Sequence, residues 1–120
     1  MLELHQLVAR AMVLYYAIIG IWGIILAVRK AAPGPSYRGA LVIGVVIGVL
    51  QAIEGVVLLV NGLRPADNLH YLYGASVIVT LPLVASYLAD RKFSRALGYG
   101  LASLFMAGLA IRAITTGGVA

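Results

Sequence analysis

Few side chains of this chain could take part in chemistry. The chain has 120 residues, of which 62% are hydrophobic and 11% are charged. Strongly polar groups inside or at the ends of its apolar runs are His5, Arg10, Gln51, Glu54, His70 and Arg112. Imidazoles bind metals and cofactors, carboxyls exchange protons, and guanidiniums pair with anions. The chain has no cysteine, which excludes disulfides, thiolate metal sites and cysteine nucleophiles.

Four apolar segments must position these groups. We expect helices at about 5–29, 39–62, 69–90 and 95–115, each of roughly the 20 residues that cross a hydrocarbon core. Strands are not expected, because four strands cannot close a barrel and an open sheet edge is unsatisfied in lipid. The mean hydropathy is +1.02, and a water-soluble fold of this length could not bury so much apolar surface. The predicted fold class is all-α, an integral membrane bundle.

The connections between the segments are short, so consecutive helices should be antiparallel neighbours in an up-and-down four-helix bundle. Residues 31–37 contain Pro33, Gly34 and Pro35, and we expect a turn there that no helix crosses. No stretch is left for a soluble domain. We therefore expect a single four-helix domain over residues 1–120.

Loop charges predict the orientation in the membrane. Positive residues gather in the first and third connections: Arg29, Lys30 and Arg38, then Arg91, Lys92 and Arg95 beside Asp90. The second connection has Arg64 balanced by Asp67. Since positive loops stay in the cytoplasm, both termini should face outward from the inner or plasma membrane of a prokaryote.

The two histidines should then lie at one depth. His5 starts the first helix and His70 the third, and these helices run parallel and can face each other diagonally. Two such imidazoles can bind opposite faces of a haem iron. Arg10 and Arg112 could pair with its propionates, and Gly74 would let a flat ring approach. The alternative is that the histidines sit at the headgroup boundary and the arginines snorkel.

The second helix carries a separate signal. Gly44 and Gly48 lie on a stripe of small residues, which indicates close helix packing. Gln51 and Glu54 follow in apolar surroundings. A carboxyl there is protonated, paired with Arg10 or Arg112, or close to a proton path, and the sequence leaves these three options open.

Three short motifs resemble heme A synthase. They are His5-Gln6-Leu7-Val8-Ala9, the Gln-x-x-x-Gly pattern within 50–57, and Leu69-His70-Tyr71. The resemblance covers about two-thirds of the chain and implies one four-helix half of that family. It implies one b-type haem per chain, with His5 and His70 as ligands. The chain departs from the family in having Glu3 two residues before its first histidine, Gln6 directly after it, and only one histidine pair.

The leading hypothesis is a membrane haem protein for electron transfer, or an accessory subunit of a respiratory or photosynthetic complex. A cofactor-free structural subunit, and a small transporter or channel subunit using Glu54, are the alternatives. Expected partners are the lipid bilayer and other membrane subunits or a redox partner, with a homo-oligomer as a further option and no nucleic acid. No hydrolase, kinase or dehydrogenase motif occurs, so the sequence does not indicate an enzyme.

Overall fold

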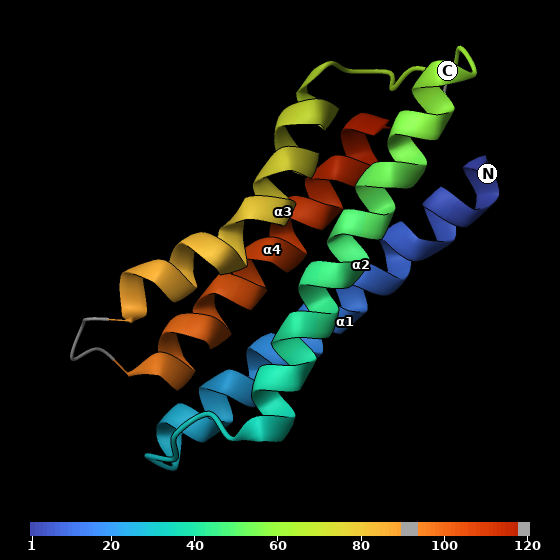
Figure 1. Cartoon of the computed structure of the whole chain (residues 1–120). Helices are drawn as coiled ribbons and strands as arrows, with labels where there is room; N and C mark the ends of the chain where they lie inside the picture. The colour runs from blue at the N-terminus through green and yellow to red at the C-terminus, as the bar shows by residue number, and fades with distance from the viewer. Residues whose placement is uncertain (90–93, 118–120) are drawn as a thin grey trace.

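A computed structural model describes residues 1–89 and 94–117 and shows four helices (Figure 1). They are α1 (Leu2–Val28), α2 (Pro35–Val60), α3 (Leu69–Leu88) and α4 (Arg95–Gly117). All four are long and apolar enough to cross a membrane. The prediction of an all-helical fold with four such helices is confirmed.

The start of α2 differs from the expected one for a local chemical reason. α2 begins at Pro35, inside the expected turn and before the expected start at about 39. Proline fits the first helical position because its N–H would be unpaired there and its φ is already helical. Gly34 precedes it as an extended N-cap. The expected end of the third helix at 90 lies outside the described residues.

Consecutive helices run antiparallel, so α1 and α3 start at the same end of the bundle (Figure 1). α1 packs against α2 and α4, and α3 packs against the same two helices. The backbones of α1 and α3 do not meet, so these two helices are diagonal partners. This is the expected up-and-down arrangement.

The closest helix pair is α1 and α4. A Cβ atom placed on Gly23 would lie 2.7 Å from Gly100 Cα and 2.9 Å from Ala96 O. One placed on Gly100 would lie 3.0 Å from Gly20 O. Small residues therefore allow the two backbones to approach closely.

Buried tyrosines join α1 to α2. The Tyr16 hydroxyl donates to Gly44 O at 2.9 Å, and the Tyr37 hydroxyl donates to Ile19 O at 2.9 Å. Gly44 and Gly48 make room for the Tyr16 ring, because added Cβ atoms would lie 3.2 and 3.3 Å from it. This agrees with the packing interpretation of the glycine stripe. Both hydrogen bonds lie away from the end of the bundle where α1 begins, and the candidate site lies at that end.

Candidate functional site

A cavity of about 470 Å³ opens at the end of the bundle where α1 and α3 begin and α2 and α4 end. Residues from all four helices and from the connection between α2 and α3 line it. Its lining is mainly apolar, and its most polar side chains are His5, Gln6, Arg10, Gln51, Arg64 and His70. Small-molecule sites are typically apolar cavities of ~300–1,000 Å³ with a few placed polar groups. The cavity therefore has the size and lining of a ligand site.

The two histidines meet in this cavity. Their ring centroids are 6.2 Å apart and the rings are inclined by 66°. His5 lies in the first turn of α1 and His70 in the first turn of α3, so both are at one depth. The two side chains therefore bring α1 and α3 into contact, although the backbones of these helices do not meet. The predicted juxtaposition is present, and ligation by the pair remains a prediction.

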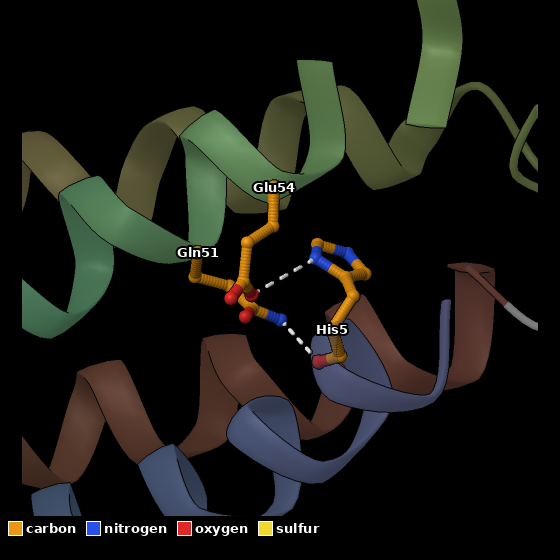
Figure 2. Close-up of polar contacts among 3 residues, drawn as sticks. All are labelled: His5, Gln51 and Glu54. Atoms are coloured by element: carbon orange, nitrogen blue, oxygen red, sulfur yellow. Dashed lines mark hydrogen bonds and ion pairs between the residues drawn. The ribbon is translucent and has the colours of Figure 1, made fainter. Parts of the chain in front are cut away.

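Each imidazole presents Nδ1 to an oxygen atom. His70 Nδ1 lies 2.7 Å from Ala113 O, and because a carbonyl oxygen only accepts, this nitrogen donates. His70 Nε2 then carries the lone pair that can bind a metal. His5 Nδ1 lies 3.9 Å from Glu54 Oε1, which is too far for a hydrogen bond (Figure 2). The Glu54 carboxyl nevertheless points at that side of the ring.

Polar atoms around His5 are buried and unsatisfied. His5 Nδ1, Gln51 Oε1 and Glu54 Oε1 have no hydrogen-bond partner among the described residues. Gln51 Nε2 donates to His5 O at 2.7 Å and so ties α2 to the first turn of α1 (Figure 2). Buried polar groups without partners are costly, and each one in a native fold calls for an explanation. His5 and Gln51 line the cavity, so a ligand there would change the surroundings of their polar atoms.

Of the three options for Glu54, pairing with Arg10 or Arg112 is not seen among the described residues. Among the described residues, the ion-pair contact of Glu54 is with His5. Glu54 follows Gln51 by three positions, which places both side chains on the face of α2 that looks toward the start of α1. The carboxyl therefore meets an imidazole and no guanidinium.

Some of the arginines near this end of the bundle line the cavity and one does not. Arg10 lines the cavity as expected. Arg112 does not line it, and its guanidinium lies 5.7 Å from the centre of the Tyr73 ring. Arg64, which the sequence had suggested only as a loop charge, does line the cavity. Its place just after α2, at the end of the bundle that carries both histidines, was the available signal.

Three glycines clear space around the site. A Cβ atom on Gly117 would lie 2.5 Å from His70 Nδ1, and one on Gly55 would lie 3.4 Å from His5 Cε1. Gly74 lines the cavity, and a Cβ atom there would have no neighbour within 4 Å. The space that we expected beside Gly74 for a flat ring is therefore present. The roles of Gly55 and Gly117 beside the histidines were not foreseen.

These residues fit a haem better than a bare metal ion. Within residues 1–89 and 94–117, no group of three or more His, Cys, Asp or Glu side chains is arranged to hold an ion. A haem would need only two imidazole ligands from the chain, and it would supply one-electron redox chemistry there. His5 and His70 would be the ligands. His70 already donates its second ring N–H to Ala113 O, as metal-binding histidines usually do, and Glu54 Oε1 lies 3.9 Å from Nδ1 of His5.

No protein-family model, curated protein or solved structure matches the chain. The resemblance to heme A synthase therefore stays a prediction.

Proposed function

We propose that this chain is an integral membrane protein that binds one b-type haem between His5 and His70 and transfers electrons. It would act alone or as an accessory subunit of a respiratory or photosynthetic complex. The observation that carries the proposal is the pair of imidazoles, 6.2 Å apart across a four-helix cavity, each with Nδ1 turned toward an oxygen atom.

The surface of the bundle supports the placement in a membrane. Large apolar side chains are exposed on every helix, among them Leu14, Val46, Leu83 and Phe105, which are 65%, 50%, 65% and 59% exposed. A water-soluble bundle turns such side chains inward and its charges outward. In a membrane these apolar side chains would contact lipid hydrocarbon instead of water.

The chain's own residues would hold and orient the cofactor. A haem with two imidazole ligands has no open iron position and supplies one-electron transfer. Ala113 O fixes the His70 ring, and Glu54 faces the second nitrogen of His5. Gln51 holds the backbone of His5 itself. Such outer contacts orient metal-binding imidazoles and raise their basicity.

The same geometry separates this proposal from the alternatives. A cofactor-free structural subunit would gain nothing from a cavity bordered by buried, unpaired polar atoms, which lower stability. A transporter subunit using Glu54 would need that carboxyl on a path through the bundle. Glu54 instead faces His5 near one end of the bundle.

The test is an absorbance spectrum of the protein purified gently from its native membrane. We expect about one b-type haem per chain with a low-spin spectrum, because two imidazoles of the chain would ligate it. His5→Ala and His70→Ala should each abolish the low-spin signature, and the double variant should be colourless. Ser76→Ala is the control, since Ser76 bonds to Leu72 O of its own helix and does not line the cavity. A monodisperse protein without a Soret band would overturn the proposal.

A further inference from the structure

Two exposed arginines line the cavity, and we call the part of the cavity that they border its mouth. Arg10 comes from α1 and Arg64 from the connection after α2, and both are exposed while lining the cavity. No aspartate or glutamate belongs to the lining. Neither guanidinium has an ion-pair partner among the described residues. The mouth is therefore cationic and unneutralised, while the rest of the cavity is largely apolar.

The acidic residue closest to Arg64 in sequence is already engaged. Asp67 Oδ1 accepts a hydrogen bond from N of Leu69, the first residue of α3, at 2.9 Å. Asp67 N donates to Thr116 O at 2.9 Å and so ties this connection to the end of α4. Pro65, which follows Arg64, further limits the backbone. Arg64 is thus held at the mouth by a fixed connection.

We propose that Arg10 and Arg64 form a carboxylate clamp that selects an apolar, planar ligand by its acidic edge. The inference rests on the proposed function: for b-type haem, the clamp would take the two propionates. Guanidinium and carboxylate form paired, charge-assisted hydrogen bonds, which give both direction and selectivity. Arg112 has no part in the clamp, because it lies over the Tyr73 ring outside the cavity.

The experiment compares two ligands that differ only at the acidic edge. Protein stripped of haem is titrated with haem b and with its dimethyl ester, which lacks the carboxylate charges. We expect the unmodified chain to favour haem b by on the order of tenfold or more, the size of one or two hydrogen bonds to charged groups. Arg10→Ala and Arg64→Ala should each weaken haem b binding while leaving binding of the ester unchanged. Arg64→Lys keeps the charge, so its affinity for haem b should lie between those of the unmodified chain and Arg64→Ala.

Arg112→Ala is the matched control and should change neither affinity. A second readout is the midpoint potential, which should fall in Arg10→Ala and Arg64→Ala, because a lost positive charge favours the ferric haem. Equal affinities for haem b and ester, or an unchanged Arg64→Ala, would overturn the clamp while haem binding stands. A chain that takes up neither ligand would overturn both proposals.

Discussion

The two candidate ligands are supported by different kinds of atoms. His70 is held by a main-chain oxygen, Ala113 O, at 2.7 Å. His5 faces the Glu54 side chain at 3.9 Å, and both of these side chains are 15% exposed. A main-chain acceptor cannot be removed by substitution, whereas a side-chain acceptor can. The orientation of His5 is therefore the part of the site that substitution can test most directly.

Glu54→Leu should loosen the haem without removing either ligand. Leucine has no oxygen to face His5 Nδ1. Loss of an outer-shell hydrogen bond typically costs ~10–100-fold in metal affinity, so for a contact of 3.9 Å we expect a loss of no more than about tenfold. Glu54→Gln keeps a carbonyl oxygen of nearly the same shape and should retain haem close to the unmodified level. Transfer of haem to an excess of an acceptor protein measures the rate of loss. If both variants lose haem equally fast, Glu54 acts through its charge and not as a neutral acceptor.

The positions of the two histidines could be predicted from the sequence better than their surroundings could. Two histidines at the starts of parallel helices had to share one depth, so their meeting followed from helix order alone. Which arginine lines the cavity depends on side-chain direction. Arg112 lies near the end of α4 yet turns to the Tyr73 ring, while Arg64 reaches the mouth from a connection. Directions of this kind are set by packing that one sequence does not display.

At the scale of the helices, α1 and α4 determine how closely the bundle packs. Their contact depends on positions without side chains, above all Gly20, Gly23 and Gly100. The lengths and apolar character of the helices were readable in the sequence because each must cover a hydrocarbon core. The close pairing of α1 with α4 was not, since these glycines lie in segments far apart in the chain. The glycine stripe in α2 could be predicted from the sequence because its glycines lie on one face of a single helix.

Gly23→Ala should destabilise the bundle. The new methyl group would meet the Tyr37 hydroxyl and lie 2.7 Å from the backbone of Gly100, and helix backbones cannot move aside independently. Overpacking of this kind costs about 1–3 kcal/mol. Reversible unfolding in mixed micelles would measure the change in the free energy of unfolding.

Gly108→Ala is the matched control for this substitution. It lies on α4, and a Cβ atom there would have no neighbour within 4 Å. Alanine should stabilise the helix at this site by about 0.5–1 kcal/mol, because glycine loses more backbone freedom on folding. Equal loss of stability in both variants would show that the contact between α1 and α4 is not what limits substitution at Gly23.

The whole molecule is polarised along its long axis, which extends 48 Å. One end holds the cavity, the start of α1, the end of α4 at Gly117, and a mixture of basic and acidic groups that includes Arg10, Arg64 and Asp67. The opposite end carries exposed Arg29, Lys30, Arg38 and Arg95, and no acidic residue among those that the structure describes there. A haem bound in the cavity would lie close to one surface of the membrane. Electron exchange would then favour a partner on that side.

This polarity predicts the topology in the membrane. The basic end should face the cytoplasm, because positively charged loops are retained there. A reporter that is active only in the cytoplasm should work when fused after Ser36 or Ser94 and fail when fused to the C-terminus. A reporter active only outside the cytoplasm should give the reverse pattern and serves as the control. A cytoplasmic C-terminus would turn the bundle over, place the cavity on the cytoplasmic side, and move its expected redox partner there.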